Sequence, residues 1–209
     1  MADEQELGAA LSDVRKAYRL LWCYQKRIFD IIRLIVDEFD DMSFYYWQTL
    51  HSGRPCNSGT DPLKRWTWDM LPMMKASYLY LPSDVDRNST KPGQWMLEIL
   101  VESDSGFDCP EDGTEPDPAN FKEAAESTSS ISIYAWYCTG VANVNWFNGV
   151  WKQISWPEID GEPFENADPP FLIVKKTLNI TSLFDKGAVQ AAASEFKEMA
   201  SKALGVTLA

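Results

Sequence analysis

Apolar residues recur at alternating steps of three and four along the first forty residues of the chain. This spacing predicts a helix whose apolar side chains form a stripe along one face, and a second row spaced by seven residues widens that stripe. No proline interrupts the pattern, so we expect the helix to run from about residue 4 to about residue 39. The main row is Leu7, Leu11, Val14, Tyr18, Leu21, Gln25, Ile28, Ile32, Ile35 and Phe39, and the second row is Trp22, Phe29 and Val36.

The expected helix is about as long as the domain that carries it. At 1.5 Å per residue it measures roughly 50 Å, while a domain of this size is about 45 Å across. Strands of five or six residues span only about 17–20 Å, so one sheet covers only part of the helix. A second copy of the chain is the simplest cover for the rest, with Gln25 fixing the register of the paired helices. We therefore expect a homodimer, although the broad stripe also fits a helix that only covers its own sheet.

Between about residue 43 and about residue 178 the pattern changes to short β-type runs separated by turn-rich loops. No helical pattern separates these runs, which favours a mainly antiparallel sheet of five or six strands. The third and fourth runs alternate cleanly between two faces, and the last two runs are less regular. The expected strands are Ser43–Leu50, Ala76–Leu81, Gln94–Ser103, Ser129–Cys138, Val150–Trp156 and Phe171–Leu178.

A second helix is expected from about residue 183 to about residue 204. The segment Ser182–Asp185 resembles a capping box at its start, and Gly205 stands where a glycine would end it. The order of elements predicts a single α+β domain over residues 1–209, with the long N-terminal helix and the C-terminal helix on one face of the sheet. The opposite face of such a sheet is usually solvated.

The net charge of the chain disfavours some classes of binding partner. The 209 residues include 31 acidic and 19 basic side chains, a formal net charge of −12. A field of that sign repels nucleic acid and anionic lipid, so we expect neither nucleic acid nor a membrane as partner. The first residues are acidic rather than basic, and no apolar run approaches the roughly 18 residues that a span requires. Four cysteines without a CxxC pair agree with a cytoplasmic protein whose thiols are reduced.

The common catalytic and cofactor motifs are absent from the sequence. His51 is the single histidine, and no ligand pair has the spacing of a zinc site, so we expect no metal and no cofactor. A nucleophilic pair of His51 with a cysteine is equally disfavoured. Carboxylates such as Asp69, Glu98 or Asp104 remain as candidates for an unfamiliar kind of enzyme. Glu98 would be functional if its face of the sheet were covered and ordinary if that face were solvated.

Aromatic residues are the most unusual feature of the composition, with nine tryptophans. Trp66 and Trp68 fall on one side of an extended segment, and Tyr134 and Trp136 share one face of a strand. Large aromatic side chains suit binding surfaces, but cross-strand aromatic pairs are also a common way to pack a sheet. Both uses stay open for these four residues.

Two arginines of the first helix are also candidate binding residues. Arg15 and Arg19 are like charges one helical turn apart, with no acid placed to relieve them within the helix. We expect them to meet acids on a partner. The sequence thus favours a non-catalytic binding or regulatory protein that acts through an aromatic sheet face, its acidic loops or the long helix. An enzyme that uses carboxylates is the alternative.

Overall fold

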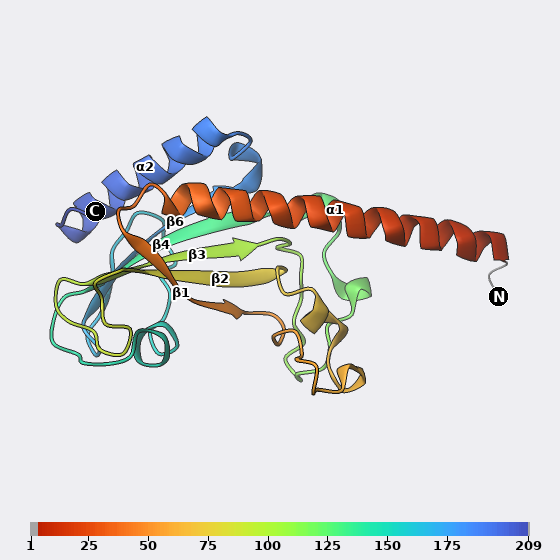
Figure 1. Ribbon diagram of the computed structural model, residues 1–209, viewed down its shortest axis with the longest axis horizontal. Helices are drawn as coiled ribbons and strands as arrows, with labels where there is room; N and C mark the ends of the chain where they lie inside the picture. Colours follow the sequence, from red (N-terminus) through yellow and green to blue (C-terminus); the bar gives the residue numbers. More distant parts are fainter. Residues whose placement is uncertain (1–3, 209) are drawn as a thin grey trace.

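The computed structural model describes residues 4–208 and has the expected α+β architecture. Six antiparallel strands form one sheet in the order β1-β2-β3-β4-β6-β5. Helices α1 and α2 lie on the same side of that sheet, and the N-terminal half of α1 extends well past the ends of the strands (Figure 1). The helices are α1 (Glu4–Val36) and α2 (Lys186–Leu204), and the strands are β1 (Met42–Thr49), β2 (Lys75–Pro82), β3 (Trp95–Glu102), β4 (Ser130–Cys138), β5 (Phe164–Asn166) and β6 (Phe171–Asn179).

Helix α1 ends at Val36, three residues before the predicted end. The backbone N–H of Asp37 still bonds four residues back, to Arg33, but the next two bond only three residues back, from Glu38 to Ile35 and from Phe39 to Val36. Asp41 then adopts a left-handed conformation with φ 55°. The apolar spacing continues to Phe39 because this side chain still packs in the core, although the backbone has already turned towards β1.

The first core lies between the sheet and the two helices, and it follows the predicted alternation. Leu97 and Ile99 of β3 and Ile133 of β4 are fully buried beneath the helices. Helix α1 contributes four isoleucines, and Phe196 of α2 packs edge-on against Phe39, with ring centroids 6.3 Å apart. The isoleucines are Ile28, Ile31, Ile32 and Ile35.

A second core covers the opposite face of the sheet, so the expectation of a solvated face is wrong. A π-helical turn over Trp146–Trp151 packs there, in a segment that the sequence pattern assigned in part to a strand at Val150–Trp156. Its buried side chains are spaced by one, three and one residues, which places them on one side of a helical turn rather than on alternate sides of a strand. The Asn145 side chain begins the turn by accepting the backbone N–H groups of Phe147 and Asn148 at 3.0 and 2.8 Å.

Helix α2 begins one turn later than the capping-box pattern indicated. Asp185, rather than Ser182, is the N-cap, and its Oδ1 accepts the backbone N–H of Ala188 at 2.8 Å. Gly205 ends the helix in the left-handed region with φ 68°, as predicted.

This cap gives a prediction of modest size. Asp185→Ala removes the acceptor of one backbone N–H at the start of α2, and we expect it to lower the free energy of unfolding by about 1 kcal/mol. Asp185→Asn keeps an acceptor at the same place and serves as the matched control. Urea denaturation followed by circular dichroism measures both. Equal losses for the two variants would show that the negative charge, rather than the hydrogen bond, stabilises the helix start.

Candidate interaction surface

Helix α1 is divided into an anchored half and a projecting half. Its isoleucines, which begin at Ile28, are buried against the sheet, whereas the large apolar side chains from Leu7 to Trp22 are exposed, and Phe29 remains 42% exposed at the edge of the sheet. Tyr18 is 70% exposed and Trp22 is 63% exposed, although both belong to the same apolar stripe as the buried isoleucines. We call these exposed side chains the α1 face: Leu7, Leu11, Val14, Tyr18, Leu21 and Trp22.

An apolar groove continues the α1 face at the root of the projecting half, which is the place where this half meets the sheet. It has a volume of about 310 Å³ and lies between α1, the edge strand β1 and the loop that precedes β2. A smaller hollow beside it is lined by Leu21 and Tyr24 of α1 and by the same loop. Gln25 lines both, so the exposed stripe leads without a break into these two hollows. The side chains around the groove are Gln25, Phe29, Phe44, Trp47, Pro72, Met73 and Tyr78.

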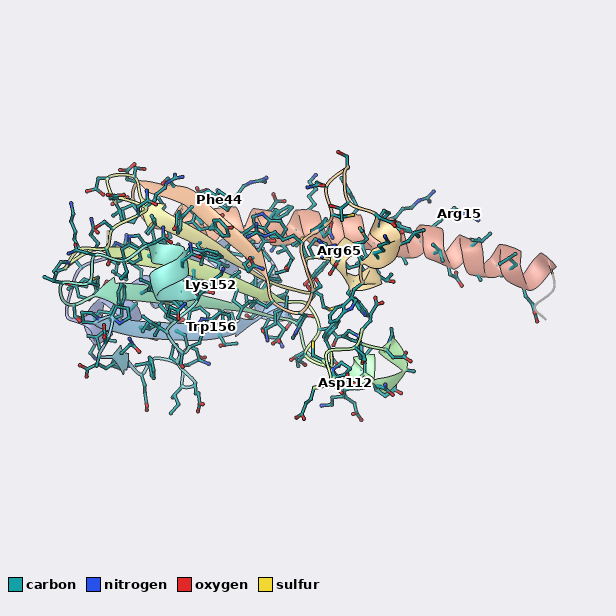
Figure 2. The ribbon with its side chains drawn as sticks, turned by 90° about the horizontal axis from the view of Figure 1, so that it is seen from below. Arg15, Phe44, Arg65, Asp112, Lys152 and Trp156 are labelled. Atoms are coloured by element: carbon teal, nitrogen blue, oxygen red, sulfur yellow. The ribbon has the colours of Figure 1, made fainter. Side chains whose placement is uncertain are left out.

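Basic side chains flank the α1 face. Arg15 and Arg19 are both exposed, as the sequence indicated, and Arg15 stands on the projecting half of the helix (Figure 2). Lys16 pairs with Asp13 at 2.9 Å, and the Lys26 ammonium lies 5.4 Å from the centre of the Trp22 ring. Helix α1 holds six basic and four acidic residues in a chain whose net charge is −12, so it carries a positive excess that the rest of the chain lacks.

Tyr134 and Trp136, the predicted binding pair on β4, are buried in the second core. Their rings lie 6.5 Å apart, and Trp136 has no exposed area. Figure 2 shows the covering segment over this face of the sheet, with Lys152 and Trp156 on it. These two aromatics therefore pack the sheet rather than present a surface.

Glu98 lies at the centre of this second core with no exposed area. Its Oε1 accepts the Ser77 hydroxyl at 2.6 Å and the Trp151 indole N–H at 2.9 Å, and its Oε2 accepts the Trp136 indole N–H at 2.8 Å. Burial raises the pKa of the Glu98 carboxyl to about 7 because the charged form loses its hydration, and the three hydrogen bonds only partly oppose this shift. The carboxyl group joins three elements, and the indoles above it separate it from solvent.

Trp66 and Trp68 lie apart from that core, in the loops at the end of the sheet. Thr67–Met70 forms a 3₁₀ helix, so these two tryptophans are not carried by an extended segment, as the spacing suggested. Trp68 donates its indole N–H to the Pro116 carbonyl oxygen at 2.8 Å and stacks on Phe121. Both indoles are half-buried. The structure thus separates the predicted aromatic residues into a buried pair and a loop pair.

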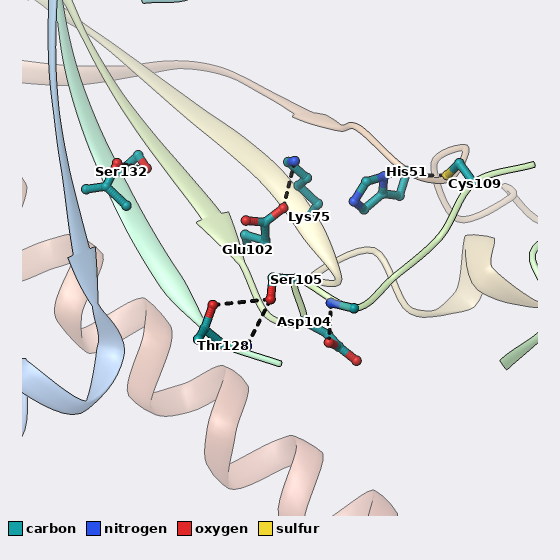
Figure 3. Close-up of polar contacts among 10 residues, drawn as sticks. His51, Lys75, Glu102, Asp104, Ser105, Cys109, Thr128 and Ser132 are labelled. Atoms are coloured by element: carbon teal, nitrogen blue, oxygen red, sulfur yellow. Dashed lines mark hydrogen bonds and ion pairs between the residues drawn. The ribbon is translucent and has the colours of Figure 1, made fainter. Parts of the chain in front are cut away.

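The same loops place His51 beside Cys109, with Nδ1 and Sγ 3.6 Å apart (Figure 3). A catalytic cysteine requires a thiolate that forms readily. Here partial burial and the neighbouring Asp108 raise the pKa of the Cys109 thiol, while burial and Lys75 lower the pKa of the His51 imidazole. Both shifts favour the neutral pair, which is the unreactive state.

The other candidate carboxylates serve as hydrogen-bond acceptors within loops. Asp69 is buried and accepts the Gly53 backbone N–H at 2.6 Å. Asp104 accepts the Gly106 backbone N–H at 2.8 Å, next to the Ser105–Thr128 contact in Figure 3. Within residues 4–208, no three His, Cys, Asp or Glu side chains come together in a way that could hold a metal ion. No helix in this described part of the chain is long and apolar enough to cross a membrane.

Comparison with known proteins places the chain in a family. Residues 4–205 match the PM0109 family, a region that covers α1, the whole sheet and α2. The chain belongs to the PM0109 family. The uncharacterized protein PM0109 of Pasteurella multocida (strain Pm70) is 28% identical over 205 residues, which cover 95% of this chain and 96% of that protein. No solved structure matches the chain.

The family match begins at the first residue of α1, so the projecting half lies within the family region. Of the site residues named from the sequence, Arg15 and Arg19 flank the α1 face, while the four aromatics lie elsewhere. Leu7, Leu11 and Val14 were recognised in the stripe, but their spacing alone did not distinguish exposed from buried positions. The groove-lining side chains of the edge strand were missed, because nothing in the sequence shows that β1 lies beside α1.

Proposed function

We propose that this protein is a non-catalytic binding or regulatory protein of the cytoplasm, and that it binds another protein chain through the α1 face. The observation that supports this proposal most directly is the exposure of six apolar side chains on the part of α1 that projects beyond the sheet. Exposed apolar patches larger than a few hundred Å² are uncommon on monomeric proteins and mark interaction sites. Tyr18 and Trp22 are residues of the kind that contribute strongly to binding.

The α1 face also has the form that helix recognition requires. Its apolar positions follow a heptad spacing, and basic side chains surround them. A partner helix with an apolar stripe fits this surface, as helices do when they pair along a seam. Acidic side chains elsewhere on the partner chain would pair with Arg15 and Arg19.

An enzyme that uses carboxylates is less well supported. Glu98 is covered by Trp136 and Trp151, and a group that reacts with a substrate needs access to it. Asp69 and Asp104 already accept hydrogen bonds that hold their loops. The contacts of all three carboxylates favour structural roles, which leaves binding as the preferred function.

A photo-crosslinking experiment in cells tests this proposal. We expect p-benzoylphenylalanine in place of Tyr18 to give a covalent adduct with a protein on irradiation. The matched control replaces Phe184, an aromatic residue that is 76% exposed and lies far along the chain, just before α2. Adducts from position 18 alone support the proposal. No protein adduct, or equal amounts from both positions, would contradict it.

A further inference from the structure

We propose that the chain bound to the α1 face is a second copy of this protein, and that the two copies pair through antiparallel α1 helices. This inference rests on the proposed function, because it names the partner of the same surface. Four features of the structure support it: the exposed area, the position of the loops below α1, the spacing of the stripe and the distribution of charge.

The exposed area is sufficient for a dimer. The exposed fractions of the α1 face are 56% for Leu7, 49% for Leu11, 48% for Val14, 70% for Tyr18, 39% for Leu21 and 63% for Trp22. With roughly 200 Å² for a fully exposed side chain of this size, they present on the order of 650 Å² per copy. Two copies would then bury about 1,300 Å² of apolar area, which lies within the range of about 1,200–2,000 Å² for stable interfaces.

The loop below α1 favours the antiparallel arrangement. The exposed stripe continues the positions that face the sheet, so it points to the same side of α1 as the sheet does. The loop residues Leu71, Met73 and Met74 already lie on that side, against Leu21 and Tyr24. In a parallel pair, the loops and sheets of both copies would compete for the space between the two helix roots. In an antiparallel pair, each sheet lies beyond the first turn of the partner helix.

The spacing of the stripe gives the register of the pair. If the two-fold axis passes beside residue 16, Val14 of one copy lies opposite Tyr18 of the other, and Leu11 lies opposite Leu21. Leu7 then lies opposite Gln25, the residue that lines both hollows at the helix root. The apolar end of each helix would fill the groove of the other copy, and Gln25 would be the single polar residue that fixes the register.

Charge favours the same arrangement. The chain as a whole is strongly acidic, so two copies repel each other, and this repulsion falls as their sheets move apart. The antiparallel pair places the sheets at opposite ends.

The edges of the sheet offer a less suitable route to association. Exposed edge strands can pair with another chain through their free backbone groups. In β1, the carbonyl oxygens of Phe44 and Trp47 accept hydrogen bonds from the guanidinium groups of Arg87 and Arg54, each at 3.3 Å. The opposite edge, β5, has only three residues. These features leave the α1 face as the favoured surface for a second copy.

Light scattering at micromolar concentration tests the dimer. We expect the full-length protein to have twice the 23.7 kDa mass of one chain. The double variant Leu11→Asp, Val14→Asp should return to the mass of one chain with unchanged circular dichroism, because both positions lie outside the folded cores. The control is Val141→Asp, which places one such charge at a valine that is 75% exposed elsewhere on the surface, and it should remain a dimer.

Disulfide trapping tests the direction of the helices. Cys23, Cys56 and Cys109 are first replaced by serine, and chains that carry Val14→Cys are mixed with chains that carry Tyr18→Cys. The antiparallel pair predicts a mixed disulfide between the two kinds of chain. A disulfide that forms only between two Val14→Cys chains would show a parallel pair and overturn the proposed arrangement.

Other outcomes separate this inference from the proposed function. A protein that stays at 23.7 kDa at every concentration, while position 18 crosslinks to a different protein, would overturn the second copy and leave the binding function intact. A single-chain mass together with sedimentation on anionic phospholipid vesicles would assign the α1 face to a membrane surface instead. A single-chain mass without any protein adduct at position 18 would overturn both proposals.

Discussion

Replacing Glu98 with glutamine is expected to abolish the contribution of this residue to the pH dependence of stability, a fall of about 3 kcal/mol between pH 4.5 and pH 7.5. The folded-state pKa of Glu98 is raised to about 7, above its ordinary value of 4.5. Within that interval the folded protein holds a proton that the unfolded chain has released. The contribution of Glu98 to the free energy of unfolding is therefore largest below pH 4.5, and it is lost as the pH rises from about 4.5 to about 7.

The variant also has a constant cost that does not depend on pH. A glutamine side chain must direct its NH₂ group towards one of the two indole N–H groups, from Trp136 or Trp151, so one hydrogen bond is lost. We expect this to lower stability by about 1–3 kcal/mol at pH 4.5. The difference between the two proteins should then shrink, or reverse its sign, as the pH rises.

Urea denaturation at half-unit steps of pH measures this effect. The matched control is Glu102→Gln, the same substitution four residues along β3, at a half-buried side chain that pairs with Lys75 at 2.7 Å. That variant retains Glu98, so it should retain the Glu98 contribution to the fall. A stability difference between the unmodified protein and Glu98→Gln that stays constant over the whole pH range would show that Glu98 keeps one protonation state throughout.

Phe196→Ala is expected to lower the free energy of unfolding by about 3–5 kcal/mol. Phe196 has no exposed area and contacts Phe39, three residues beyond the end of α1, so its removal leaves a cavity in the core between the helices and the sheet. The cost combines the lost burial of the ring with the contacts that its neighbours lose.

Phe184→Ala is the matched control for this prediction, because it removes the same ring from a position that is 76% exposed. We expect a change of less than about 0.5 kcal/mol for it. Thermal or urea denaturation compares the two variants. Similar losses would mean that α2 is not held by its buried aromatic residue.

The fold could be predicted largely from local periodicity, because the elements that pack against the first core have regular patterns. Alternation in β3 and β4 placed Leu97, Ile99 and Ile133 on one face, and the structure buries them beneath the helices. The second core could not be predicted, because residues distant in the sequence supply the cover. Trp151 approaches Glu98 from a π-helical turn whose buried residues follow neither a two-residue nor a regular 3.6-residue repeat.

The candidate surface could be predicted only in part. Comparing the helix length with the size of the domain indicated that some of the stripe would be uncovered. The unrelieved like charges of Arg15 and Arg19, a separate observation, indicated binding residues on the same helix. The comparison of lengths could not show where exposure begins, because Trp22 and Ile28 have the same apolar character and differ only in what lies beneath them. Trp66 and Trp68 were misplaced because a 3₁₀ helix, which has no clear sequence signal here, turns the chain between them.

The contact between α1 and α2 has a consequence for how the chain is made. Phe39 and Phe196 meet although 156 residues separate them, and the root of α1 also packs on strands from the middle of the chain. During synthesis α1 leaves the ribosome before any strand of the sheet, with its isoleucine stripe exposed. The first core cannot close until α2 has been translated, and such distant contacts slow folding. For most of its synthesis the nascent chain therefore presents the apolar stripe of a long helix to the molecules around the ribosome.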